Sequence, residues 1–402
     1  MSNQPITTNN ILDIVTVRDK SVTSNYKNGV KLPISTFIED YMNGRVDINC
    51  DVQDLIQARL KFFNYKFIPH HVKWFVSTFI PETILHSPTQ DERVIRNHYD
   101  RGNDFFGGFL GDRMIYTSAF FKTGTESLET AQDQKLDLVC RKLQMKRGEK
   151  HLDIGCGWGT LVAHAAKYYG TDSTGITIAQ AGADYCNAQI ARWGVSDRAR
   201  VNRMDYREIP NTKYDKISCL EMAEHVGVRK FTTFMKQIAG MLNDDGLFYL
   251  QIAGLRAGFH HESLTWGCFM GEYIFPGADA SMPLSFVVTR LEKAGFEIHS
   301  VETVGIHYSQ TIQYWYDNWQ RNKVELGKKY GEWWVRCWDI FLAWSVEIAR
   351  QGNSTCFQIV CNKNLDMYPR RRFIGGVNLG ERDLVTNGTV NAGGLGETVP
   401  MV

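Results

Sequence analysis

A short apolar run that ends in an acidic residue and three alternating glycines constrains this chain most strongly. Residues 149–160 read EKHLDIGCGWGT, and apolar residues at helical spacing follow from Leu161 to Ala166. This order predicts a strand, a tight glycine-rich turn and a helix. Because glycine accepts backbone angles that other residues avoid, the turn can approach a ligand closely beside the helix N-terminus. By itself, the pattern is equally consistent with an ordinary connection between a strand and a helix.

Further strand candidates extend this unit into a larger fold. Short apolar runs occur at residues 173–176, 201–204, 216–220, 247–252, 296–303 and 355–360, with helix-like stretches between most of them. Seven strands that alternate with helices predict a doubly wound α/β fold, in which a mainly parallel sheet binds ligands at the carboxyl ends of its strands. Helical spacing also predicts an amphipathic helix at 128–143, immediately before the first strand.

The remaining segments suggest the domain organisation. We expect a mostly helical N-terminal region, 1–88, whose polar first 30 residues are loose. Residues 89–365 hold the main domain, and within it the Trp- and Tyr-rich segment 306–353 is too long for a hairpin connection. A helical insertion that covers the site is therefore expected there. The Gly-, Asn- and Thr-rich tail, 366–402, is expected to be disordered.

Two unusual segments with several aromatic residues precede the glycine-rich turn. Residues 98–106 read HYDRGNDFF, and residues 114–121 read MIYTSAFF. The first is too polar and glycine-rich for a core helix. Taken alone, both segments are interpreted as surface loops with aromatic anchors.

Composition excludes several classes of function. The 402 residues carry 45 Lys and Arg against 44 Asp and Glu, so the net charge of +1 predicts no binding of nucleic acid. Nine cysteines without a C-x-x-C pair or metal-ligand spacing predict no metal site and mostly buried free thiols in a reducing compartment. Neither a signal peptide nor a run of about 18 apolar residues occurs, so we expect a cytoplasmic protein, free or peripheral to a membrane. Oligomeric state is not indicated.

Polar residues follow two of the other predicted strands at their carboxyl ends. Asp205 follows the third strand, and it is as consistent with a helix N-cap as with a ligand contact. Two carboxylates, Glu221 and Glu224, and the imidazole of His225 follow the fourth strand, where such side chains are costly to bury without partners or a chemical task. A structural Glu–His pair is the alternative interpretation.

Eight motifs in order carry a resemblance to a known family. They are HYDRGNDFF, MIYTSAFF, LDIGCGWGT, GITIAQ, MDYRE, EMAEHVG, EYIFPG and HYSQT, between about residues 89 and 365. This part of the chain resembles the cyclopropane-fatty-acid-synthase family of S-adenosylmethionine (SAM) dependent lipid methyltransferases, which have a Rossmann-like sheet. Within that family, EMAEHVGVRKF, LQIAGLR and YIFPGADAS are most similar to the fungal sphingolipid C-methyltransferases, which methylate carbon nine of the sphingoid base.

The resemblance implies SAM as the cofactor and a set of site residues. The residues that would line the SAM site are Tyr116, Thr117, Asp153, Gly155, Gly157, Thr177, Gln180, Asp205 and Tyr206. Asp153 would neighbour the methionine portion of SAM, and Thr177 or Gln180 would replace the acidic residue that many methyltransferases place on the ribose. Glu224 and Tyr308 would lie at the reaction centre, together with His225 and Gln251.

Departures from the family pattern bear on the reaction. Ser118 stands where cyclopropane synthases have a Cys, Gln251 stands where they have a bicarbonate-binding His, and Gly182 stands where a Gln near the ribose is common. The sphingolipid enzymes have two N-terminal membrane spans, and no such span is predicted here. Without the bicarbonate His, a product with a methyl branch on a restored double bond is favoured over a cyclopropane.

The predicted function is therefore methylation of a carbon–carbon double bond in an unsaturated lipid, with the sphingoid base as first candidate. The expected partner is a lipid or another hydrophobic small molecule. Two alternatives remain at this point. One is an N- or O-methyltransferase of small molecules that uses the same site, and the other is a SAM-binding scaffold without activity.

Overall fold

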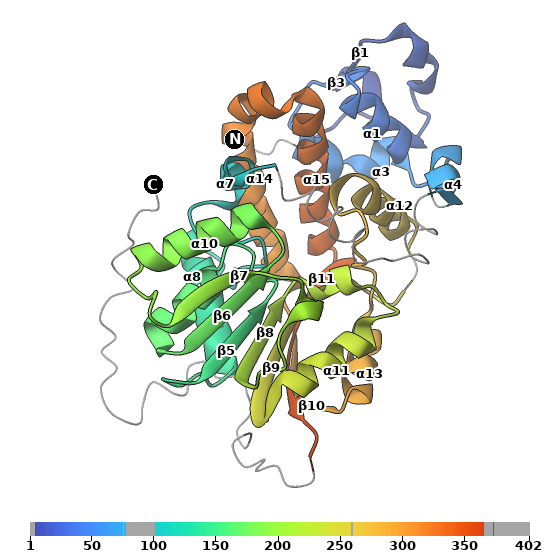
Figure 1. Cartoon of the computed structure of the whole chain (residues 1–402). Helices are drawn as coiled ribbons and strands as arrows, with labels where there is room; N and C mark the ends of the chain where they lie inside the picture. The colour runs from blue at the N-terminus through green and yellow to red at the C-terminus, as the bar shows by residue number, and fades with distance from the viewer. Residues whose placement is uncertain (1–4, 75, 78–100, 259, 366–372, 374–402) are drawn as a thin grey trace.

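A computed structural model describes residues 5–74, 76–77, 101–258, 260–365 and 373. A twisted sheet with helices on both faces forms one part of the molecule, and the N-terminal region packs beside two long helices that rise from that sheet (Figure 1). The predicted disordered tail, 366–402, lies outside the described residues except for Phe373.

The main sheet has seven strands, as the sequence predicts. They are β5 (Lys150–Ile154), β6 (Asp172–Thr177), β7 (Ala199–Arg203), β8 (Tyr214–Leu220), β9 (Leu242–Leu255), β10 (Phe296–Thr303) and β11 (Ser354–Lys363). Their order across the sheet is β10-β11-β9-β8-β5-β6-β7. Only β11 runs antiparallel to its neighbours, and all other pairs of the sheet are parallel. The carboxyl ends of β5, β6 and β8 therefore meet at one edge of the sheet.

Alternating side chains of the central strands bury both faces of this sheet. Along β9, Leu247 and Tyr249 pack with α8 (Leu128–Lys142), whereas Phe248 and Leu250 pack with α11 (Phe231–Met241) and α13 (Leu284–Lys293). This two-residue period is what a strand between two helical layers requires. Helix α8 confirms the amphipathic helix predicted at 128–143, and its N-cap Ser127 accepts a hydrogen bond from the backbone N–H of Thr130.

The N-terminal region is more structured than the sequence suggests. Its elements are η1 (Ile11–Asp13), β1 (Val15–Val17), η2 (Lys20–Asn25), β2 (Leu32–Pro33), α1 (Ile34–Met42), β3 (Val46–Ile48), α2 (Val52–Gln57), α3 (Arg59–Phe62), β4 (Phe63–Asn64) and α4 (Pro69–Trp74). Residues 11–25, predicted to be loose, form the first three of these. Strand β1 pairs with β3, and Ile11 and Val15 are buried in the core. A few apolar side chains thus anchor a segment whose average composition is polar.

The segment around residues 98–106 also differs from its prediction as a surface loop. Residues 98–100 lie outside the described part, but Asn103–Leu110 form helix α7. The side chains of Phe105, Phe106, Phe109 and Leu110 are fully buried. These four residues share one face of the helix, because positions i, i+1, i+4 and i+5 lie close together around its axis. Polarity averaged over the whole segment hides this face.

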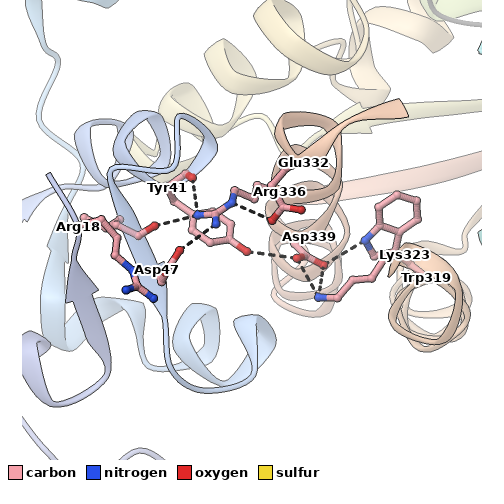
Figure 2. A network of polar contacts seen from close by, with 9 residues as sticks. Arg18, Tyr41, Asp47, Trp319, Lys323, Glu332, Arg336 and Asp339 are labelled. Carbon is pink, nitrogen blue, oxygen red and sulfur yellow. Dashed lines mark hydrogen bonds and ion pairs between the residues drawn. The ribbon is translucent and has the colours of Figure 1, made fainter. Parts of the chain in front are cut away.

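Two long helices, α14 (Gly305–Tyr330) and α15 (Glu332–Arg350), connect β10 to β11 and contact the N-terminal region (Figure 1). They confirm that the connection between the last two strands is helical. In the contact, the buried Asp339 of α15 accepts hydrogen bonds from Trp319 and Lys323 of α14 and from the hydroxyl of Tyr41 of α1 (Figure 2). Among the described residues, no helix is long and apolar enough to cross a bilayer.

A buried ion pair also connects the N-terminal region to the rest of the structure. The guanidinium of Arg59 in α3 contacts Glu262 of α12 (His261–Phe269), and both side chains are almost completely buried. Glu262 also accepts hydrogen bonds from Tyr65 and Trp344. Burial alone would raise the pKa of Glu262, but its bonds to Arg59 and these neighbours lower it overall.

We predict that Arg59→Met destabilises the protein by about 3–5 kcal/mol, because it leaves the carboxylate of Glu262 buried without its countercharge. Urea unfolding followed by circular dichroism measures the change. Lys328→Met is the matched control, since its pair with Glu325 is exposed and exposed pairs contribute about 1 kcal/mol or less. Equal unfolding midpoints for the two variants would contradict the role assigned to Arg59.

Candidate active site

The glycines of the turn after β5 serve two different purposes. Gly155, Gly157 and Gly159 all have positive φ angles, of 74°, 56° and 73°. A Cβ atom on Gly155 would lie 2.5 Å from the side chain of Met222, and one on Gly159 would lie 2.8 Å from Sγ of Cys186. A Cβ on Gly157 would meet no atom within 4 Å. Gly155 and Gly159 thus allow close packing, and Gly157 leaves open space above the turn.

That open space belongs to a cavity of about 170 Å³ at the carboxyl ends of the central strands. Its lining includes most of the residues predicted for the SAM site: Tyr116, Thr117, Asp153, Gly155, Gly157, Thr177, Asp205 and Tyr206. His225, predicted for the reaction centre, also lines it. Gln180 does not, because its side chain donates a hydrogen bond to Asp184 at 2.8 Å on the exposed side of α10 (Gln180–Arg192). Of the two residues considered for the ribose, only Thr177 faces the cavity.

Two buried ionisable groups, Asp153 and Lys135, line the cavity. Asp153 accepts a 2.6 Å hydrogen bond from Oγ of Ser218, and burial raises its pKa to about 6. Lys135 of α8 donates from Nζ to Oγ1 of Thr117 at 2.8 Å, and burial lowers its pKa to about 8. The charges of Glu221 and Asp153 oppose that lowering.

Lys135 has no assigned role in the sequence analysis, since charged residues of an amphipathic helix usually face water. The available signal is its spacing. It lies four residues before the buried Val139 and therefore on the apolar face of α8.

Asp205 satisfies both of its sequence interpretations. It is the N-cap of η5 (Tyr206–Glu208), where its carboxylate accepts from the backbone N–H of Arg207 at 2.9 Å, and it also lines the cavity. The guanidinium of Arg207 forms an ion pair with the same carboxylate at 2.6 Å. Tyr206 packs edge-on against Phe234 at 4.8 Å between ring centroids.

One end of the cavity is organised around Glu221, a residue that sequence reasoning leaves without a role. Its Oε1 accepts hydrogen bonds from the backbone N–H of Ser118 at 3.0 Å and from Nε2 of Gln251 at 2.6 Å. Its Oε2 accepts from the hydroxyl of Tyr308 at 2.7 Å. Gln251 and Tyr308 are therefore brought together, as predicted, but around Glu221. The motif EMAEHVG contains both carboxylates, and only the position at which β8 ends distinguishes them.

Glu224 lies one turn further along, in η6 (Ala223–Val226), and is buried. Its Oε1 accepts a hydrogen bond from the backbone N–H of Ala253, and it lines neither this cavity nor the second one described below. Burial and the neighbouring charge of Glu221 raise its pKa to about 8. A part for Glu224 in the chemistry stays a prediction.

A second cavity, of about 560 Å³, lies beside the first. Apolar side chains dominate part of its wall, including Trp74, Trp266, Met270 and Phe275. The Phe275 ring is 6.0 Å from the ring of Tyr116, which lines the first cavity, so this aromatic pair separates the two spaces. In the described part of the chain, no group of three His, Cys, Asp or Glu side chains is placed to hold a metal ion.

Comparison with known proteins identifies the family. Residues 86–359 match the family described as mycolic acid cyclopropane synthetase. The chain belongs to this family. It is 48% identical over 367 residues to a sphingolipid C9-methyltransferase of Komagataella phaffii, a match that covers 89% of this chain and 75% of that protein. A sphingolipid C9-methyltransferase of Candida albicans is 44% identical over 366 residues, with 89% and 71% covered.

Solved structures agree with this assignment. The mycolic acid cyclopropane synthase CmaA1, complexed with SAH and CTAB, has a TM-score of 0.65 and 25% identity, over 68% of this chain and 98% of that one. Coclaurine N-methyltransferase also has a TM-score of 0.65, over 82% of this chain and 99% of that one, but at 19% identity it shows the fold alone. The protein is thus a SAM-dependent methyltransferase. The glycine turn, the open space above Gly157 and the lining residues Asp153 and Asp205 fit that cofactor.

We predict that Gly157→Val weakens SAM binding at least about tenfold, equivalent to about 1.4 kcal/mol, because the new side chain enters the cavity. Calorimetric titration with SAM measures the affinity. Gly148→Val is the control, since Gly148 also has a positive φ and open space around it but lies outside the cavity. If both folded variants bind SAM equally, the cavity is not the cofactor site.

We also predict that the free energy of unfolding of Glu224→Gln, relative to that of the unmodified protein, increases as the pH rises from about 4.5 to 8. The raised pKa means that the folded state keeps a proton that the unfolded state loses in this window, so the unmodified protein loses stability there. The difference between pH 5 and pH 9 should exceed about 1.4 kcal/mol, the equivalent of one pKa unit. Urea unfolding at both pH values tests this, and parallel pH profiles would contradict it.

Proposed function

We propose that the chain adds a methyl group from SAM to a carbon–carbon double bond of a sphingoid base, at carbon nine. The observation that carries the proposal is an identity of 44–48% with sphingolipid C9-methyltransferases over 84–89% of this chain. The chain spans 66–75% of the length of those relatives.

The second cavity supports a hydrophobic substrate. At about 560 Å³ it is larger than the SAM cavity, and its apolar wall of Trp74, Trp266, Met270 and Phe275 suits a hydrocarbon chain. Because Phe275 packs near Tyr116, a chain held in this cavity lies next to the cofactor site. Arg229, Lys230 and Arg256 also border the cavity and provide polar contacts for the head of a lipid.

The reaction places demands on these walls. Bound SAM supplies a methyl group on a positively charged sulfur, which leaves as a neutral thioether when the alkene's π electron pair forms the new C–C bond. An alkene is a weak nucleophile, so the protein must hold it in line and at near-attack distance. Positive charge then appears on the neighbouring carbon. Aromatic faces stabilise such a cation by about 0.5–2 kcal/mol each. Three aromatic rings lie close together here. The ring centroid of Trp315 is 5.5 Å from that of Tyr116 and 6.0 Å from that of Tyr308.

We further propose that the enzyme works at a membrane surface. The side chains of Phe67, Val72 and Val76 are 44–65% exposed around α4, whose Trp74 lines the second cavity. Lys66 and Lys73 are exposed in the same stretch. Apolar side chains interspersed with lysines suit an interface with anionic lipid, and this position would deliver a lipid directly to the cavity.

We predict that incubation with SAM and a sphingolipid with an unsaturated base gives a product with one additional methyl group on a restored double bond. Mass spectrometry gives the mass gain, and proton NMR gives the signal of a methyl group on an alkene carbon. A saturated sphingoid base is the control and should remain unmodified. Cyclopropane protons, or a methyl group on nitrogen or oxygen, would refute the proposal and would favour one of the alternative methyltransferase activities.

A further inference from the structure

Four hydrogen-bond donors from distant parts of the chain converge on the carboxylate of Glu221. They are the backbone N–H of Ser118, Nε2 of Gln251 in β9, the hydroxyl of Tyr308 in α14 and, at 3.6 Å, the thiol of Cys356 in β11. Each oxygen of the carboxylate accepts at least one of these bonds, and the residue lines the SAM cavity. Charged acceptors in a partly buried site are held strongly by such donors.

The donors themselves are fixed in orientation. Oε1 of Gln251 accepts hydrogen bonds from the hydroxyl of Tyr249 at 3.2 Å and from Nε2 of Gln358 at 3.1 Å, so its amide nitrogen must face Glu221. Tyr308 is a proton donor at neutral pH, because burial and the charge of Glu221 raise its pKa well above the usual value. The site therefore presents donors only, which suits an ionised carboxylate.

The backbone at Glu221 is held in an unfavourable conformation. Its φ of 53° is one of three positive values at described residues other than glycine. This left-handed conformation costs roughly 1–2 kcal/mol for a residue with a side chain. Strain of this kind persists where the surrounding structure imposes it, and it is often found at functional sites. Here it directs the carboxylate away from the line of β8 and toward the donors.

We propose that Glu221 is the general base that completes the methylation. This inference rests on the proposed function. After the methyl group has been added, the substrate is positively charged at the carbon next to the methylated one. A carboxylate oxygen of Glu221 removes the proton from the methylated carbon, and the C–H electron pair forms the new double bond. Glu221 is then a neutral acid, and it returns its proton to water when the product leaves.

The other carboxylates of the cavity and its lysine are held by other partners. Among the described residues, the two further carboxylates that line it are Asp153 and Asp205, which are held by Ser218 and Arg207 respectively. Lys135 donates to Thr117 from its Nζ. Glu221 combines a place in the cavity wall with an orientation set by neutral hydrogen-bond donors. Because this base is part of the chain, the reaction needs no dissolved anion.

The test uses two substitutions of Glu221 in the full chain. Glu221→Gln keeps the size of the side chain and removes its basicity. Glu221→Gly suits the positive φ and leaves the donors of Glu221 around a space in which a small carboxylate can bind. Single-turnover rates with SAM and the unsaturated sphingolipid are measured with and without added sodium formate. Melting temperature and calorimetric SAM affinity are measured on the same preparations.

We expect Glu221→Gln to lower the single-turnover rate at least about a hundredfold while SAM affinity changes by no more than a few-fold. Formate should raise the rate of Glu221→Gly at least about tenfold and leave that of Glu221→Gln unchanged, since the Gln side chain fills the space. A residue with a purely structural role would give no such rescue.

Glu224→Gln is the comparison variant, because Glu224 is the neighbouring buried carboxylate. A larger rate loss in Glu224→Gln than in Glu221→Gln would overturn the assignment, as would a near-normal rate in Glu221→Gln. A folded, SAM-binding Glu221→Gly that formate does not rescue would also overturn it. Failure of the proposed function would give a different result, and it would be seen in the unmodified enzyme. That enzyme would then methylate nitrogen or oxygen, or leave the lipid unchanged.

Discussion

The hydrogen bonds of the Glu221 carboxylate join four parts of the chain that are far apart in sequence. They connect the end of β8 with the loop at Ser118, with β9 through Gln251, and with the long helix α14 through Tyr308. This arrangement includes an unfavourable left-handed backbone conformation at Glu221. The contacts position the end of β8, the loop at Ser118, β9 and the helical insertion relative to one another.

The rest of the fold supports this site by holding α14 and α15, the two Trp- and Tyr-rich helices, in place. Helix α15 carries Asp339, which binds side chains from α1 and α14, and Glu262 joins α12 to Arg59 of the N-terminal region. These buried charges are matched by partners, and removing one partner would leave the other uncompensated. The N-terminal region thereby fixes α14 and α15 from the side opposite the sheet (Figure 1). Its Trp74 also contributes to the wall of the second cavity.

Local sequence patterns predict the sheet and the cofactor turn well, because strands with an apolar period of two and a glycine-rich turn depend on neighbouring residues. Seven strands and the residues Gly157, Thr177 and Asp205 could be placed this way. The roles of Lys135 and Glu221 could not, since each depends on contacts with distant segments. Helix α7 was missed for a related reason, because its buried face becomes apparent only when α14 packs against it.

The central claim is that a carboxylate of the chain removes a proton from the carbon that has received the methyl group. The most direct measurement uses SAM whose transferred methyl group carries three deuterium atoms, with mass spectrometry of the lipid product. If Glu221 acts as proposed, the product keeps all three deuterium atoms, because the proton leaves from the substrate carbon. A product with only two would show that the proton leaves from the methyl group, and it would contradict this account.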